Sequence, residues 1–390
     1  MRLITRIVIL ALLATPATIG ASFMQGPVVG AVLPPWTPGI LDIHQIATGR
    51  GNAAFLMLPD GTTVLVDAGD AGDVPGLSAR PDASRTPAQW IARYLRHMQN
   101  SPGARLNYAV LTHYHPDHIG AFAALGAEVA IDTIIDRGDA YLAPPVDDPT
   151  YAAYRKFLAA NPRIARRTAE AGSAGQIVTR KIDPAFEARI VSVNDRVWTG
   201  TAQDTRVRFP ALATITVPDD RPTENMCSVT LRIKYGAFDY FTGGDQPGYP
   251  NPGNPSWHDL ETAVATAIGP TDVHVVNHHG SIEEENLFWL KTLASRVMIV
   301  PAWSTTHPSP DVLKRMLARR VYDAPRDIFV TSLRPETKAA IGPRAAQVAA
   351  DEGHIVVRVE PGGARYWVLV LDASAETYKV RAIHGPYQST

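Results

Sequence analysis

The sequence predicts an α/β fold, because apolar runs typical of buried strands are interspersed with segments typical of helices. Tyr and Val in the apolar run 108–111 indicate a buried strand, and the Ala-rich segment 119–125 behind it indicates the start of a helix. A second helix is expected at 86–97. Further apolar runs on both sides of this region predict additional strands.

The N-terminus is typical of a secretory signal. Arg2 and Arg6 flank the apolar stretch 7–14, and small residues follow at 17–22. We expect a signal peptide at 1–22, one domain at 23–390 and a secreted or periplasmic protein that does not stay on the membrane. The alternative is an uncleaved membrane anchor, but the stretch is shorter than the roughly 20 apolar residues that span a bilayer.

The composition argues against a nucleic-acid-binding protein and against a disulfide-stabilised one. The formal net charge is −1 over 390 residues, so no strongly basic surface is expected and no stable complex with nucleic acid. Cys227 is the single cysteine, which excludes an internal disulfide and leaves stability to the apolar core. The composition leaves the oligomeric state open.

The segment 41–66 predicts a β meander. Glycines at 49 and 51 separate the first two strands, and Pro-Asp-Gly at 59–61 forms the next turn. The last strand ends on Asp67. A carboxylate at this place can support imidazoles bound to a metal, although a simple turn residue is the alternative.

Four potential metal ligands follow the strand at 108–111: His113, His115, Asp117 and His118. On an extended backbone, residues i and i+2 point the same way, so the first two imidazoles can bind one ion. Three imidazoles and one carboxylate are ligands that zinc prefers, with iron or manganese as alternatives. A coincidental His-rich loop is the other interpretation, but the strand and helix around the cluster favour a metal site.

Later strands also end on polar residues. Asp245 follows two glycines after the strand expected at 238–242, and the backbone of glycine permits close approach to an ion. His278 and His279 follow the strand expected at 272–277; we expect His278 to be the ligand, because it comes first, and His279 to face the substrate or support the site. His307 lies in the loop after another strand, where a lone histidine is often surface decoration.

These motifs resemble the metallo-β-lactamase superfamily. The resemblance rests on Asp-Ala-Gly at 67–69, Leu-Thr-His-Tyr-His-Pro-Asp-His-Ile-Gly at 111–120, Gly-Gly-Asp at 243–245 and Asn-His-His-Gly-Ser at 277–281. With Gly-Arg-Gly-Asn at 49–52, they are similar to the metallo-hydrolase domain of bacterial DNA-uptake (competence) channel proteins, without the channel-forming part. The resemblance covers roughly 41–357 in scattered motifs.

The resemblance implies a four-layer αββα sandwich with one or two zinc ions at the sheet edge. It implies that Asp245 is shared by both ions, and it makes His307 part of the last motif. The expected function is zinc-dependent hydrolysis of a small-molecule or polymeric anionic substrate by a metal-bound hydroxide, with Asp117, His279 and His307 as catalytic residues. A phosphodiester is the first choice of substrate. An ester or lactone, or a metal-binding module without catalysis, are the alternatives.

Two regions outside these motifs are less informative. Proline and glycine punctuation suggests an insertion at 137–223, and 353–390 is expected to form C-terminal strands. Basic residues at 155–167 predict a solvated helix face, or alternatively a lid that attracts an anionic substrate.

One expected histidine is missing. The superfamily usually supplies another between the His cluster and the bridging carboxylate, but no histidine occurs from 119 to 257. His113 and His115 then have only Asp245 and water, unless the side chain at 224, 225 or 307 reaches in. The second position has Asp117, His118, His278 and Asp245. We therefore expect the first position to be the more easily emptied.

Overall fold

The computed structural model describes residues 26–249 and 253–390, so the signal peptide expected at 1–22 lies outside the described residues. The first sheet has nine strands in the order β17 (Val380–Gln388), β16 (Arg365–Leu371), β15 (His354–Val359), β1 (Leu41–Gln45), β2 (Ala54–Met57), β3 (Thr63–Val66), β4 (Arg105–Val110), β5 (Ala130–Asp136) and β6 (Ala165–Thr168). The second has eight, in the order β14 (Asp327–Val330), β13 (Val297–Val300), β12 (Val273–Val275), β11 (Phe238–Thr242), β10 (Thr230–Tyr235), β7 (Phe186–Val193), β8 (Arg196–Trp198) and β9 (Thr205–Val207).

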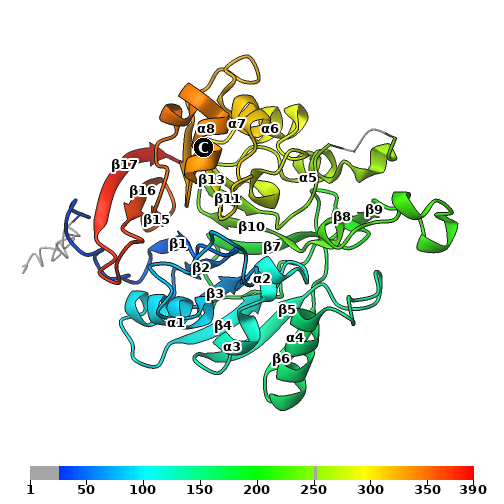
Figure 1. The fold of residues 1–390 in the computed structure, drawn as a ribbon, viewed down its shortest axis with the longest axis horizontal. Helices are drawn as coiled ribbons and strands as arrows, with labels where there is room; N and C mark the ends of the chain where they lie inside the picture. Colours follow the sequence, from blue (N-terminus) through cyan, green and yellow to red (C-terminus); the bar gives the residue numbers. More distant parts are fainter. Residues whose placement is uncertain (1–25, 250–252) are drawn as a thin grey trace, which may run out of the picture.

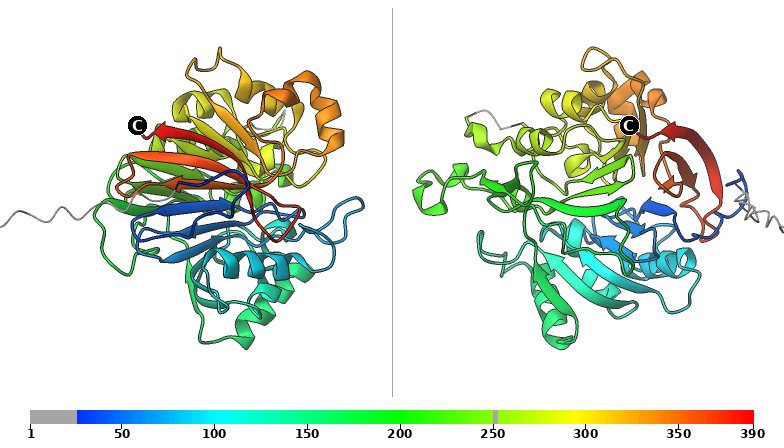
Figure 2. Two further views of the ribbon diagram at one scale, coloured as in Figure 1. Left: turned by 90° about the vertical axis from the view of Figure 1, so that its left-hand side faces the viewer. Right: turned by 180° about the vertical axis from the view of Figure 1, so that it is seen from behind.

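Helices lie on the outer faces of the two sheets (Figures 1 and 2). Those beside the first sheet are α1 (Pro87–Met98), α2 (Pro116–Ile119), α3 (Phe122–Leu125) and α4 (Pro149–Ala160). Those beside the second are α5 (Leu260–Ile268), α6 (Leu287–Leu293), α7 (Pro310–Leu317) and α8 (Pro335–Ile341). The predicted α/β class and its four-layer αββα arrangement are therefore confirmed.

Three large apolar cores among the described residues hold these layers together. The central core lies between the sheets and joins side chains such as Val110 of β4 and Tyr240 of β11. A second core packs Leu95 of α1 and Phe122 of α3 on the first sheet. A third packs Trp289 of α6 against the second sheet. This alternation of helix, sheet, sheet and helix buries both faces of each sheet.

The elements around the His cluster form close to where the sequence places them. Thr86 caps α1 with a reciprocal capping box to Gln89, which fixes the start of that helix. The helix expected at 119–125 is instead two short helices, α2 and α3. The first begins at Pro116, whose fixed φ suits the first helical position, and α2 ends before Gly120.

Residues 137–223 contribute strands to both sheets of the sandwich. They supply α4, β6 and the three strands β7, β8 and β9, and β7 pairs antiparallel with β10 over most of its length. The helix α4 buries Tyr154 and Phe157 against the first sheet, whereas Arg155 and Lys156 are exposed. These two charges form a solvated face, but the helix ends at Ala160, and Arg166 lies on β6, where it pairs with the buried Asp136 at 2.7 Å.

The C-terminal strands extend the first sheet, because β15 pairs antiparallel with β1 and carries β16 and β17 outward. On the other side of β1, the chain continues through β2 and β3 to β4, which pairs parallel with β3. Strands β11 to β14 are also parallel. Within the described ranges, no helix is both long and apolar enough to cross a bilayer.

Candidate metal centre

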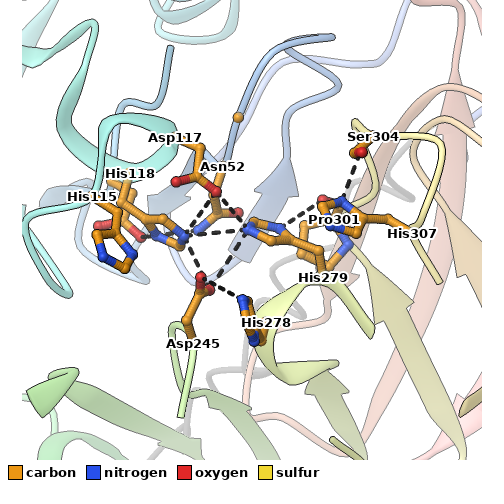
Figure 3. Close-up of polar contacts among 12 residues, drawn as sticks. Asn52, His115, Asp117, His118, Asp245, His278, His279, Pro301, Ser304 and His307 are labelled. Carbon is orange, nitrogen blue, oxygen red and sulfur yellow. Dashed lines mark hydrogen bonds and ion pairs between the residues drawn. The ribbon is translucent and has the colours of Figure 1, made fainter. Parts of the chain in front are cut away.

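The polar residues expected at strand ends come together at one edge of the sandwich. Asp67 follows β3, the His cluster follows β4, Asp245 follows β11, and His278 and His279 follow β12. Because the carboxyl ends of parallel strands meet at the same edge, each sheet brings its own set to this place. Figure 3 shows the imidazoles of His118 and His279 and the carboxylates of Asp117 and Asp245 facing one another.

Asp67 holds His118 in one orientation. His118 Nδ1 lies 2.8 Å from Asp67 Oδ2, which also accepts hydrogen bonds from Asn52 Nδ2 at 3.0 Å and Thr112 Oγ1 at 2.9 Å. A carboxylate acceptor fixes the proton on Nδ1 and leaves the lone pair on Nε2. The role expected for Asp67 as a supporting carboxylate agrees with this geometry, and its positive φ of 62° places it in the left-handed region.

Four ligand atoms converge in what we call the second metal position, formed by Asp117, His118, His279 and Asp245. His279 Nε2 lies 3.0 Å from Asp117 Oδ2 and 3.3 Å from His118 Nε2, which in turn lies 3.0 Å from Asp245 Oδ1. His279 Nδ1 lies 3.0 Å from the carbonyl oxygen of Pro301, so its proton is also on Nδ1. Two imidazole lone pairs and two carboxylate oxygens therefore face one another, an arrangement that only a cation or added protons can stabilise.

The first metal position is formed by His113, His115 and Asp245. His113 Nε2 lies 3.1 Å from His115 Nδ1 and 3.7 Å from Asp245 Oδ2. Asp245 thus offers one oxygen to each position, and its Oδ1 is buried without a hydrogen-bond partner. Nitrogen and oxygen donors in this number are a set that fits zinc, so the residues present fit a two-ion centre.

His278 was expected to be the ligand of the second position, but the structure places its neighbour His279 there. His279, rather than His278, joins the second position, and it is 2% exposed. Both residues have positive φ, 45° and 56°, so the chain leaves β12 through a left-handed turn instead of continuing as a strand. After this turn His279 Nε2 lies 3.0 Å from Asp117 Oδ2, whereas His278 Nδ1 lies 2.9 Å from Glu284 Oε1.

Glycines make the close approach of these loops possible. A Cβ on Gly69 would lie 1.7 Å from the carbonyl oxygen of Asp117, and one on Gly244, where φ is +58°, would lie 2.9 Å from the Cβ of Thr112. A side chain at either place would push the strand-end loops apart. The expectation that glycine before Asp245 serves close backbone approach agrees with this contact.

His307 is buried beside the second position and is not surface decoration. Its exposed fraction is 6%, and its ring stacks on that of His279 with centroids 4.8 Å apart. The Ser304 N–H faces His307 Nδ1 at 3.4 Å, so the proton is on Nε2. Burial, followed by the neighbouring His279 and His278, holds the pKa of His307 well below its usual value.

The carboxylates of the centre interact with imidazoles alone among the described residues, since each ion pair of Asp117 and Asp245 goes to a histidine. Burial raises the pKa of Asp245, but its histidine neighbours, led by His118, lower it by more. Burial likewise lowers the pKa of His118, and the carboxylates of Asp245, Asp117 and Asp67 raise it well above the usual value. The carboxylates of the centre are therefore ionised, and they favour a positive charge beside them, either a bound cation or a protonated imidazole.

Of the three side chains suggested for the missing ligand, Glu224 is already engaged, because Arg137 donates to both of its oxygens at 2.7 Å. Asn225 lies at the centre, with Nδ2 3.3 Å from His278 Nε2. Sequence reasoning missed Glu284, which is buried and lies in a run of three glutamates after the Asn-His-His-Gly-Ser motif. Nothing in that run distinguishes the glutamate that contacts His278.

The chain was compared with known protein families, with curated proteins and with solved structures. The sequence model of the metallo-beta-lactamase superfamily matches residues 47–216, which include the His cluster. This segment of the chain is therefore similar to the metallo-beta-lactamase superfamily, whose members are usually hydrolases but are diverse. No curated protein sequence matches the chain.

Solved structures with a similar fold share little sequence with this chain. A mutant of the CmlA beta-hydroxylase is 13% identical over 84% of this chain, with a TM-score of 0.37; the match spans 55% of the hydroxylase chain. A putative zinc-dependent hydrolase of the superfamily from Thermotoga maritima is 11% identical over 75% of this chain and 100% of its own, with a TM-score of 0.32. A metallo-beta-lactamase from Hirschia baltica is 12% identical over 81% and 97%, with a TM-score of 0.26. The narrower resemblance to competence proteins stays a prediction.

Proposed function

We propose that this chain is an exported zinc-dependent hydrolase that cleaves a phosphodiester with water activated at the metal centre. The observation that carries the proposal is the position of Asp245, whose two oxygens face separate groups of imidazoles. A carboxylate placed in this way can bridge two cations. Divalent cations bound there would supply Lewis acidity, lowering the pKa of a coordinated water to about 7 and neutralising charge on a phosphoryl group.

The surrounding residues provide the remaining functions of a hydrolase. Asp117 is more open than Asp245, with side-chain exposures of 16% and 3%. Its carboxylate can therefore orient the attacking water and accept its proton on the oxygen that does not face His279. His307 Nε2 carries a proton and can donate a hydrogen bond to substrate beside the second position. Asp67 and the carbonyl oxygen of Pro301 keep the two imidazoles of the second position aligned.

The same centre also suits esters and lactones, so the substrate classes are compared directly. The purified protein should be compared on bis-p-nitrophenyl phosphate, a p-nitrophenyl ester and a cephalosporin, each with and without added zinc. Zinc-dependent turnover that is highest on the phosphodiester supports the proposal. Preference for the ester would make the protein an acyl hydrolase of the same fold, and zinc binding without turnover would make it a binding module.

Export is proposed from the charged and apolar pattern of the first residues. The mature chain should begin between 17 and 23 and should be recovered outside the cytoplasm. N-terminal sequencing of exported material tests this, and Met1 on membrane-bound protein would indicate an anchor instead.

A further inference from the structure

The first metal position has one donor residue fewer than the second. His113 and His115 are joined there only by Asp245, which both positions share, and the segment 119–257 contains no histidine. A fourth protein donor, if there is one, comes from outside the His cluster, and the geometry around Asp245 points to His278.

His278 faces the same oxygen of Asp245 as His113 does. Its Nε2 lies 3.7 Å from Asp245 Oδ2, and His113 Nε2 also lies 3.7 Å from that atom. The neighbouring His279 contacts the other oxygen, Oδ1, at 3.6 Å. Figure 3 shows the ring of His278 beside Asp245, with a dashed line that joins the two side chains.

Glu284 fixes the ring of His278 for this role. Its Oε1 lies 2.9 Å from His278 Nδ1, and the glutamate side chain is 0% exposed. The proton is therefore on Nδ1, and the lone pair of Nε2 points to the centre, as in other imidazoles whose second nitrogen bonds a carboxylate. The same device occurs at His118, where Asp67 is the carboxylate.

Asn225 is the side chain that competes for this lone pair. Its Nδ2 lies 3.3 Å from His278 Nε2, while its Oδ1 is buried without a hydrogen-bond partner. A cation that binds Nε2 would displace the amide donor. The other candidates are occupied elsewhere, since Arg137 holds Glu224 and the ring of His307 stacks on His279.

We propose that His278 supplies the third imidazole of the first metal position and that Glu284 orients it, so the two adjacent histidines serve different ions. This inference rests on the metal-binding part of the proposed function and is independent of the substrate. His278 has a side-chain exposure of 29%, against 2% for His279, so the first position stays the more easily emptied.

The test measures metal rather than turnover. Metal-free wild-type protein and variants are equilibrated with buffered zinc, and bound zinc is determined by mass spectrometry and calorimetry. We expect two equivalents in the wild type, a tight and a weaker one. His278→Ala should retain the tight equivalent and lose the weaker one, and Glu284→Gln should weaken that equivalent by about 10- to 100-fold. Glu283→Gln is the matched control and should bind as the wild type does.

Double variants identify which ion is lost. His113→Ala with His278→Ala should still bind one equivalent, because both changes empty the same position, whereas His278→Ala with His279→Ala should bind none. Circular dichroism establishes that each variant is folded.

The variant Asn225→Ala tests whether the amide is a ligand, and it should keep both zinc equivalents. Two wild-type equivalents in His278→Ala, or loss of the weaker one in Asn225→Ala alone, would overturn the inference. Two equivalents in a wild type that hydrolyses no substrate would instead overturn the proposed function and leave this assignment in place.

Discussion

Oδ2 of Asp67 lies 2.8 Å from Nδ1 of His118, and both side chains are buried at the floor of the metal centre. Asp67→Asn should weaken the tight zinc equivalent by about 10- to 100-fold, because an amide cannot accept from every donor that now surrounds the carboxylate. Asparagine tolerates positive φ, so the backbone at 67 is not expected to change. Zinc titration measures the effect, with the exposed Asp73→Asn as control. Unchanged affinity would show that the carboxylate does not support the ligand.

The His cluster should be needed for metal and for turnover but not for folding. His115→Ala is expected to lose the weaker zinc equivalent and His118→Ala the tight one, and both should lose hydrolysis, while apolar residues such as Val110 and Phe122 still specify the strand and helix on either side. Metal analysis and circular dichroism of the same samples check both parts. Near-wild-type turnover in either variant would contradict the metal-centre interpretation.

Substitution of His307 should separate chemistry from metal binding. Because its ring stacks on His279 but does not belong to either ligand group, His307→Ala should lower turnover by about 10² or more with zinc content unchanged. The decisive comparison is kcat against bound zinc. Loss of one equivalent would make His307 a ligand, and loss of neither would remove it from the mechanism.

A pH effect on stability is expected at His44 of β1, which does not belong to either group of candidate metal ligands. Burial, offset in part by Asp42 and reinforced by Arg358, lowers the pKa of His44 from 6.5 to about 4. A depressed pKa means that the neutral imidazole stabilises the fold above pH 6.5, and this contribution is lost as the pH falls toward 4. The shift corresponds to roughly 2 to 3 kcal/mol between pH 7.5 and 4.5.

The variant His44→Gln isolates this effect, since glutamine does not titrate and the remaining groups are common to both proteins. The difference in unfolding free energy between wild type and variant should shrink by that amount when urea unfolding of metal-free protein is repeated at pH 4.5. A difference that is the same at both pH values would place the charge change elsewhere.

The sequence predicted those parts of the centre that lie close together in the chain. The cluster from His113 to His118 occupies one strand end and one helix start, so local periodicity was enough to interpret it. Asp245 could be placed because two glycines and a strand precede it. The same locality explains why α1 and the meander of β1 to β3 agree with expectation.

Contacts that depend on tertiary geometry could not be predicted. Which of His278 and His279 joins the second position depends on a left-handed turn at these two non-glycine residues. No feature of the sequence predicts that turn. The contact between His278 and Glu284 depends on how the loop before α6 folds back. Likewise, the residues expected to form an insertion supply β7, because pairing with β10 completes the second sheet.

Hydrolysis is expected to require metal held by the carboxylates and imidazoles around Asp245. The most direct test is to titrate zinc into metal-free protein while following bis-p-nitrophenyl phosphate hydrolysis and bound zinc in the same samples. We expect no turnover without zinc, and a rise in turnover that follows zinc occupancy and saturates when both positions are filled. Turnover in the metal-free protein, or zinc that binds fully without producing any phosphodiester hydrolysis, would contradict it.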